Sequence, residues 1–286
     1  MSKQLHWVLG HHAVDALLSV NPERAIALYV VLNPKNASQQ AVLNKAASIG
    51  LSFTAVDKRE LSKRCDSEQH QGIAVQAKPK QDGGDQELQH FVAQLMDRKT
   101  PFLLILDQVQ DPHNLGACLR TADAAGVDAL IVAKDNASPV TAVVQKVASG
   151  AAETMPIYRV SNLARTMDSL KQQGIWMIGT SDKANHSLYQ ETLTGALALV
   201  MGSEAKGLRN LTEKKCDVLV SLPMSATVVS SLNVSVATVF VYMKLSGNAV
   251  SHKRFAAKFF KNCSCRLSAS CVYFLLTSDK NSARVD

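Results

Sequence analysis

Three stretches of the sequence gather glycine, amide, carboxylate and guanidinium groups directly after apolar runs. In the first, "NLGACLRTA" (114–122), Asn114 and Arg120 follow the apolar run at 102–106. Gly116 allows close backbone approach or a positive φ, and Arg120 lies one to two turns into the predicted helix. Asn114 can equally cap a helix through its side-chain oxygen and leave Arg120 as an ordinary surface charge, so this stretch alone does not decide the chemistry.

The other two stretches are "VMGSEAKGLRN" (200–210) and "LPMSATVVSSLNVSVAT" (222–238). Gly202 ends an apolar run and would admit a ligand against the backbone, and Glu204 suits the positive end of a helix dipole. Ser231 can cap a following helix that carries Asn233 in its first turn. Neither a P-loop nor Gly-x-Gly-x-x-Gly occurs in the sequence, which disfavours phosphate-cradling nucleotide chemistry.

The elements that would position these groups alternate along the chain. Apolar runs predict buried strands at 102–106, 128–133, 155–160, 175–180, 196–201 and 217–222. Helical spacing of apolar residues predicts helices at 115–125, 140–149, 162–173, 207–215 and from about 231. Such alternation indicates a mostly parallel sheet with helices on both faces, and ligands of these sheets bind at the carboxyl ends of the strands.

The first part of the chain is typical of a separate, small α/β unit at residues 1–78. Strands are expected at 27–32, 52–56 and 70–79, with a helix at 38–50 that begins at Ser38 and stops at Gly50. Residues 79–96 begin with proline, paired glycines and charges, and we interpret them as a linker. The second domain is then expected at 97–238.

Composition limits the possible classes of protein. The formal charge is +7, but residues 239–286 hold eight basic and two acidic residues, or +6, which leaves +1 for the rest. Bulk charge therefore gives little support to a nucleic-acid partner. The six cysteines resemble neither a disulfide framework nor a zinc site, and no membrane span or signal peptide is expected, so cytoplasmic residence is the default.

In combination, the three stretches resemble the three motifs of the SpoU (TrmH) family of RNA ribose 2′-O-methyltransferases. The resemblance spans residues 5–238, and the segments "HWVLGHHAVDALL" and "HQGIAV" look like the L30e-like RNA-binding domain that precedes the catalytic domain in some members. It implies a trefoil-knotted SPOUT fold, S-adenosylmethionine as methyl donor and an obligate homodimer. The members it is most similar to methylate a guanosine in the peptidyl-transferase region of 23S rRNA.

The resemblance also assigns roles to residues. Arg120 is implied as the catalytic residue, and the residues that shape the site with it are Asn114, Glu204, Ser231 and Asn233. The cofactor would be bound by Gly202, Leu222 and Leu232. For contact with folded RNA the candidates are His70, Gln71 and Gly72, because polar loop residues beside glycine suit backbone and 2′-hydroxyl contacts; a turn joining two strands explains them equally well.

The implied reaction is in-line attack of a ribose 2′-oxygen on the sulfonium methyl group. Keeping an arginine neutral at pH 7 costs roughly 7 kcal/mol, from a pKa near 12.5 at about 1.4 kcal/mol per unit. We therefore favour Arg120 as a group that orients the target phosphate and stabilises the developing alkoxide, rather than as a literal base. Two alternatives to an active methyltransferase are a non-catalytic protein that binds RNA and dimerises, and an inactive remnant. A Rossmann methyltransferase is disfavoured, because that fold needs a glycine-rich loop after its first strand.

Two features depart from the family pattern. Ala226 stands where a glycine is expected, and one extra residue lies between Pro223 and Asn233, in the loop that should wrap the cofactor. The second departure is the tail, 239–286, which we interpret as a translation of a shifted reading frame. A family-like ending, GVCLYEAVRQRS, can be back-translated so that loss of its first base encodes VFVYMKLSGNAV, the residues at 239–250.

Overall fold

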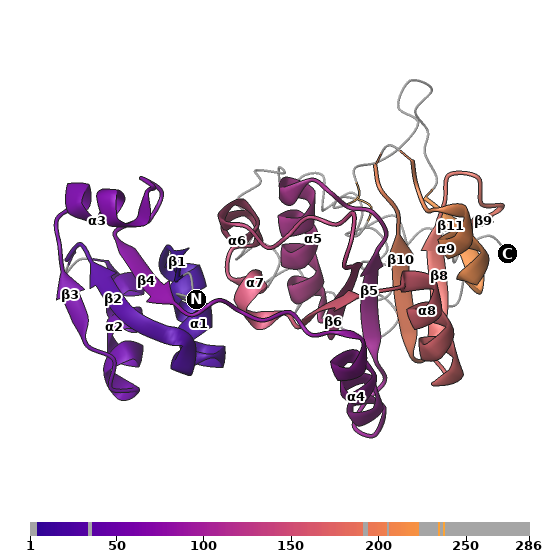
Figure 1. The fold of residues 1–286 in the computed structure, drawn as a ribbon, viewed down its shortest axis with the longest axis horizontal. Coiled ribbons are helices and arrows are strands. Elements are labelled where there is room, and N and C mark those ends of the chain that lie inside the picture. Colours follow the sequence, from indigo (N-terminus) through magenta and orange to yellow (C-terminus); the bar gives the residue numbers. More distant parts are fainter. Residues whose placement is uncertain are drawn as a thin grey trace, which may run out of the picture.

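The computed structural model describes residues 5–33, 36–190, 194–204, 206–222, 234 and 237. They form two sheets, each with its own helices, joined by a single stretch of chain (Figure 1). Within the described residues, no helix is both long and apolar enough to cross a membrane.

The first unit is a four-stranded sheet in the order β1-β4-β2-β3, in which only β2 and β3 run parallel. Helices α1 and α2 pack on one face, because Val14, Leu17, Val42 and Ala46 share a core with alternate residues of the strands. The elements are β1 (His6–Leu9), α1 (His11–Val20), a 3₁₀ turn (Pro22–Arg24), β2 (Ala25–Val30), α2 (Ala37–Ser48), β3 (Phe53–Ala55), α3 (Lys58–Cys65) and β4 (Ile73–Ala77).

The second unit is a seven-stranded, fully parallel sheet in the order β7-β6-β5-β10-β8-β11-β9. Its elements are α4 (Asp85–Met96), β5 (Phe102–Leu106), α5 (Pro112–Ala125), β6 (Ala129–Ala133), α6 (Ala142–Ala148), α7 (Ala151–Thr154), β7 (Ile157–Val160), α8 (Leu163–Gln172), β8 (Trp176–Thr180), β9 (His186–Ser187), β10 (Leu197–Met201), α9 (Asn210–Lys215) and β11 (Val218–Ser221). The expected parallel α/β sheet is confirmed.

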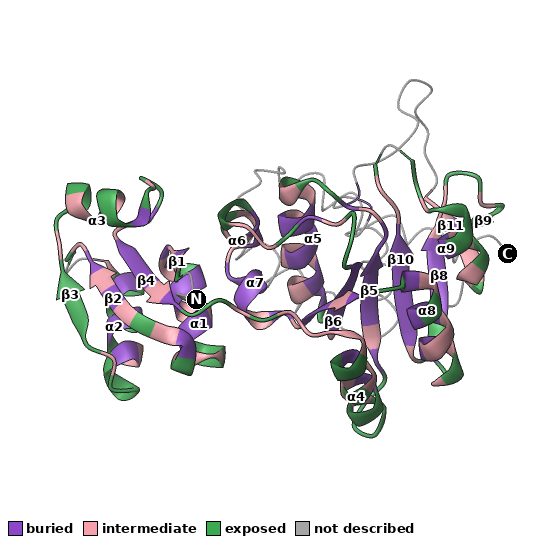
Figure 2. Cartoon of the chain, viewed as in Figure 1, coloured by how far each residue is buried: buried purple, intermediate pink, exposed green. Residues whose placement is uncertain are grey.

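Helices cover both faces of this sheet, as predicted. Helices α5, α6 and α7 share one core with the strands, while α4 and α8 share the other. Figure 2 shows the strands β5, β6 and β10 buried between these layers, with the outer surfaces of the helices exposed. Near-continuous apolar strands such as Phe102–Leu106 are what a sheet covered on both faces requires.

Three details of the expected elements need correction. The helix expected to begin at Ser38 begins at Ala37, with Asn36 as its N-cap, and α5 begins at Pro112 with Asp111 as N-cap, so Asn114 is not a cap. Helix α4 lies within the stretch that we interpreted as linker, and its Leu88 and Val92 are buried against the sheet. The expected helix from about 231, Pro223, Ala226 and the tail 239–286 lie outside the described residues.

The short connection before α4 is bound to the second sheet. Gly83 forms a parallel bridge with Tyr158, through the bonds Gly83 N–H to Ile157 O at 2.9 Å and Arg159 N–H to Gly83 O at 2.8 Å. Next to it, Asp82 accepts a hydrogen bond from Arg159 Nε at 2.6 Å. The connection is therefore fixed along the edge of β7 rather than a free tether.

Candidate active site at the carboxyl edge of the sheet

The first two motif loops meet where β5 and β10 end, at the carboxyl edge of the parallel sheet. β5 and β10 are neighbours in register, so the loops that follow Leu106 and Met201 leave the sheet side by side. The expected clustering of these loops follows from this pairing.

Gly202 begins a tight loop that closes on itself at Gly207. Ser203 and Gly207 exchange two backbone hydrogen bonds, at 3.1 and 2.8 Å. A Cβ at Gly202 would lie 2.0 Å from the carbonyl carbon of Gly207, a distance that no side chain could tolerate. The sequence predicted a glycine that admits a ligand; in the described residues it is the backbone of the chain itself that requires the glycine.

Asp107 anchors this loop from the end of β5. Its carboxylate is fully buried and accepts hydrogen bonds from the Arg209 backbone N–H at 3.0 Å and from Arg209 Nε at 2.7 Å. A buried carboxylate is costly unless it is paired, and here one arginine supplies both donors. Sequence reasoning did not identify this residue, although an acidic residue closing an apolar run is the signal that could have found it.

Asn114 and Glu204 join the two loops directly. Asn114 lies in the first turn of α5, and its Nδ2 donates a hydrogen bond to Glu204 Oε2 at 3.1 Å. The two residues are ninety positions apart in the sequence. Two of the expected site residues are thus brought into contact.

A cavity of about 420 Å³ opens beside this contact, at the ends of β8, β10 and β11. Its lining includes the apolar residues Met201, Val220, Leu222, Val234 and Ala237. Its charged residues are Asp182, Glu204 and Glu213 together with Lys183 and Lys206. Its volume lies within the usual range for small-molecule sites, and its mixed lining suits a ligand with a flat apolar part and charged groups of both signs. The expected residues Gly202, Leu222 and Glu204 line this cavity.

Arg120 lies two turns further along α5 and is not among the residues that line the cavity. It is partly buried, and no ion pair to a described carboxylate is formed. Gly116 sets the path of this helix, because a Cβ there would lie 2.7 Å from Val147 Cβ of the adjoining segment. The expected close approach at Gly116 is confirmed, whereas its φ is not positive. Ser231, Leu232 and Asn233 lie outside the described residues.

His70 of the first unit is buried, and both of its ring nitrogens bond within the chain. Nδ1 accepts from the Gly72 N–H at 2.9 Å, and Nε2 lies 3.0 Å from the Ser62 hydroxyl. Burial lowers the pKa of His70, which favours the neutral ring that these bonds require. These bonds show that His70 stabilises its own loop, whereas the neighbouring Gln71 is exposed to solvent.

The comparisons with known proteins agree with these loops. Residues 101–243 match the SpoU rRNA Methylase family, and residues 7–83 match the RNA 2′-O ribose methyltransferase substrate binding family. The chain belongs to the SpoU rRNA methylase family.

Relatives in this family align over most of their length. A Vibrio vulnificus protein named 23S rRNA (guanosine-2′-O-)-methyltransferase RlmB is 49% identical over 81% of this chain and 92% of its own. The Escherichia coli protein of the same name is 47% identical over 81% of this chain and 93% of its own. Among solved structures, the SpoU methyltransferase AviRb from Streptomyces viridochromogenes, in complex with the cofactor AdoMet, is 20% identical with a TM-score of 0.69, over 85% of this chain and 90% of its own.

The structural match confirms the SpoU methyltransferase fold. The segment that the family resemblance threads through a trefoil knot follows Leu222 and is outside the described residues, apart from Val234 and Ala237. Both of these side chains are buried in the core on the α5 side of the sheet.

Proposed function

We propose that this chain transfers a methyl group from S-adenosylmethionine to the ribose 2′-oxygen of a guanosine in 23S rRNA. The observation that carries the proposal is near-full-length similarity, at 47–49% identity, to proteins named for this reaction. The contact between Asn114 and Glu204 supports it, because it joins the first two family motifs beside a cavity of suitable size.

The cavity fits S-adenosylmethionine by its chemistry. The apolar residues Val220, Leu222 and Val234 suit an adenine ring. The carboxylates Glu204 and Asp182 suit the sulfonium and ammonium groups of this ligand, and Lys183 and Lys206 suit its carboxylate. When bound, the cofactor supplies an already activated methyl group, so that the protein has to position the two reactants and remove a proton.

Among the described residues, Arg120 is the candidate that acts on the RNA. As a permanently charged planar fork, it can hold the phosphate next to the target ribose and stabilise the alkoxide as it develops. Asn114 and Glu204 hold the first two loops together, and the loop from Gly202 forms one wall of the cofactor cavity. We assign Ser231 and Asn233 to the site, and Leu232 to the cofactor, on the family resemblance.

We propose further that the protein works as a homodimer in the cytoplasm, with residues 1–78 selecting the RNA and residues 97–238 carrying out the transfer. The family resemblance supports the dimer, and the substrate-binding match at 7–83 supports this division. The tail at 239–286 would then replace the family's last helix.

Tritium transfer from labelled S-adenosylmethionine to an unmodified 23S rRNA transcript tests the proposal. We expect label in the 2′-O-methylguanosine fraction after nuclease digestion, and no label with a transcript that already carries the modification. The chain as written is assayed beside a version with the reading frame restored after Thr238. Binding of the transcript by both versions without transfer by either would instead show a non-catalytic RNA-binding protein.

A further inference from the structure

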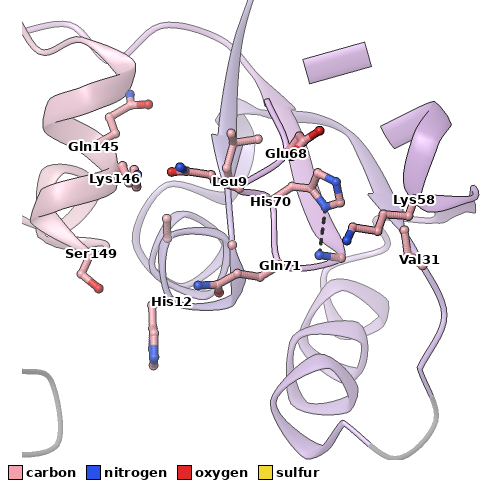
Figure 3. A pocket seen from close by; sticks show the side chains of 14 residues that line it. Leu9, His12, Val31, Lys58, Glu68, His70, Gln71, Gln145, Lys146 and Ser149 are labelled. Carbon is pink, nitrogen blue, oxygen red and sulfur yellow. Dashed lines mark hydrogen bonds between the residues drawn. The ribbon is translucent and has the colours of Figure 1, made fainter. Parts of the chain in front are cut away.

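A second cavity, separate from the one beside Glu204, lies between the two units. It measures about 630 Å³, and Figure 3 shows its walls converging from both units. The first unit contributes the β1–α1 turn, the start of α3 and the loop before β4. The residues of this wall that matter below are Lys58, Glu68, Gln69, His70, Gln71 and Gly72. From the second unit come Gln145, Lys146 and Ser149, in and just after α6. We call this cavity the interdomain cleft.

Buried polar contacts hold the two walls of the interdomain cleft together. Arg24 forms an ion pair with Glu153 of α7, and both side chains are largely buried. Gln145 Nε2 lies 3.0 Å from His6 Nε2 of β1, which ties α6 itself to the first unit. Because these contacts fix one unit against the other, a ligand in the cleft meets both walls at a defined spacing.

The chemistry of the cleft suits a nucleotide. The side chains of Gln69, Gln71 and Gln145 offer amide donors and acceptors, which match the edges of bases. Two exposed ammonium groups, Lys58 and Lys146, lie on opposite walls and suit a phosphate. Since Glu68 is the one acidic residue in the lining, the net charge of the lining is positive.

The backbone of the cleft is held in an unusual conformation on both walls. Gln71 and Ser149 each have a φ of 53°, and they are two of five non-glycine residues with positive φ in the described part of the chain. The buried His70 holds the first of these turns through its bond to the Gly72 N–H (Figure 3). Strained backbone persists where the surroundings enforce it, and it often accompanies binding sites.

We propose that the interdomain cleft binds one unpaired nucleotide of the substrate RNA, at a distance from the guanosine that is methylated. Gln71 would read the base, and Lys146 would pair with a neighbouring phosphate. This inference rests on the proposed function and deepens it: the substrate is recognised by residues of both units at once, so that correct RNA must engage the first unit and α6 together. We infer an unpaired base because the major groove of A-form RNA is too deep and narrow for side chains to read, and sequence-specific recognition of RNA mostly targets unpaired bases.

Binding measurements with the full chain and an unmodified 23S rRNA transcript test the cleft. We expect Gln71→Ala and Lys146→Glu each to raise the Kd for the transcript about tenfold or more while the Kd for S-adenosylmethionine, measured by calorimetry, stays unchanged. Arg98→Glu is the charge-matched control, because Arg98 is exposed between α4 and the start of β5 and does not line the cleft; it should bind as the unaltered chain does.

A second measurement does not depend on variants. In a transcript containing 4-thiouridine, cross-links should map to peptides that hold residues 68–72 and 145–149. If both variants bind RNA normally and the cross-links map elsewhere, the cleft proposal is overturned while the methyltransferase proposal stands. If neither the unaltered chain nor the frame-restored chain binds or methylates the transcript, the proposed function falls, and the cleft proposal with it.

Discussion

Arg120 differs at the residue scale from three other arginines of the molecule. Arg24, Arg159 and Arg209 each bond a carboxylate, and these bonds hold elements together. Arg120 has no such partner among the described carboxylates, so its charge stays available to an RNA phosphate. It lies on the same helix as Asn114, about two turns further along.

We expect Arg120→Lys to lower the single-turnover rate of methyl transfer about 100-fold, as for loss of one preorganised donor, and to leave S-adenosylmethionine binding unchanged. A lysine keeps the charge but loses the planar fork. Rapid quench with labelled cofactor measures the rate. Arg165→Lys, an exposed position on α8, serves as the control. A near-normal rate for Arg120→Lys would show that the fork is dispensable.

Gly202→Ala tests the loop that closes on Gly207. The added methyl group would meet backbone 2.0 Å away, so the loop has to open. We expect a loss of stability of about 1–3 kcal/mol, as for overpacking, together with loss of cofactor binding. Urea unfolding and calorimetry measure the two effects, with Ser203→Ala as the neighbouring control. Tight cofactor binding by Gly202→Ala would disprove this account of the loop.

The sequence indicated some site residues and not others, for physical reasons. Gly202 and Glu204 could be predicted from the sequence, because a glycine and an acidic residue that follow an apolar run are local signals. The pairing of Asp107 with Arg209 spans about a hundred positions, and no local pattern reports it. The N-cap of α5 was misplaced because Asp111, followed by Pro112, outcompetes Asn114 as a helix start.

At the scale of elements, α7 is the short helix on which the two units meet. Lys80, from the connecting stretch, donates hydrogen bonds to the carbonyl oxygens of Ala152 at 2.7 Å, Glu153 at 3.1 Å and Met155 at 2.7 Å. Arg24 reaches the side chain of Glu153 on the same helix. A helix of four residues thus receives cations from both the first unit and the connection.

Burial lowers the pKa of Lys80 to about 8, below its ordinary value of 10.5. Between these two values the unfolded chain binds the proton more tightly than the folded chain, so folding stability should rise with pH in this window. We expect the free energy of unfolding to increase from pH 8 to pH 10 relative to that of Lys80→Gln, measured in urea. The exposed Lys78 provides the control Lys78→Gln, and parallel pH profiles for all three proteins would contradict the prediction.

Strands were the elements most accessible to prediction. β5 lies at the predicted residues because a run such as Phe102–Leu106 can be buried on both faces only inside a covered sheet. Helix α4 was not predicted because the proline, paired glycines and charges just before it are typical of a linker, although Leu88, Phe91 and Val92 recur at helical spacing and pack on the sheet. Helices α1 and α3 were not predicted as elements, since the first unit was judged mainly from its strands.

At the scale of the whole molecule, we predict that the tail at 239–286 weakens the proposed homodimer. The family match ends at residue 243, a few residues after the predicted change of reading frame. We expect the chain as written to dimerise poorly, bind S-adenosylmethionine weakly and aggregate through apolar residues such as Phe240 and Tyr242.

Restoring one base after the Thr238 codon should give a soluble, active dimer. Its length should be about 250 residues, where the family-like ending would stop. Solubility should improve because exposed apolar patches favour aggregation and the restored frame removes those of the tail. Analytical ultracentrifugation and methyl transfer compare the two chains, and resequencing the gene tests the origin of the tail. If the frame is confirmed as written and the 286-residue chain purifies as an active dimer, the prediction is wrong.

The connection fixed along β7 has a consequence for how the molecule melts. Gly83 is bonded into the edge of the sheet, and Arg24 of the first unit is buried against Glu153 of the second. Unfolding of either unit would therefore break this buried ion pair and remove the packing of α1 against α7, so each unit depends on the other for stability. We expect differential scanning calorimetry to show one cooperative heat-absorption peak, so that a destabilising substitution in either unit lowers the melting temperature of both.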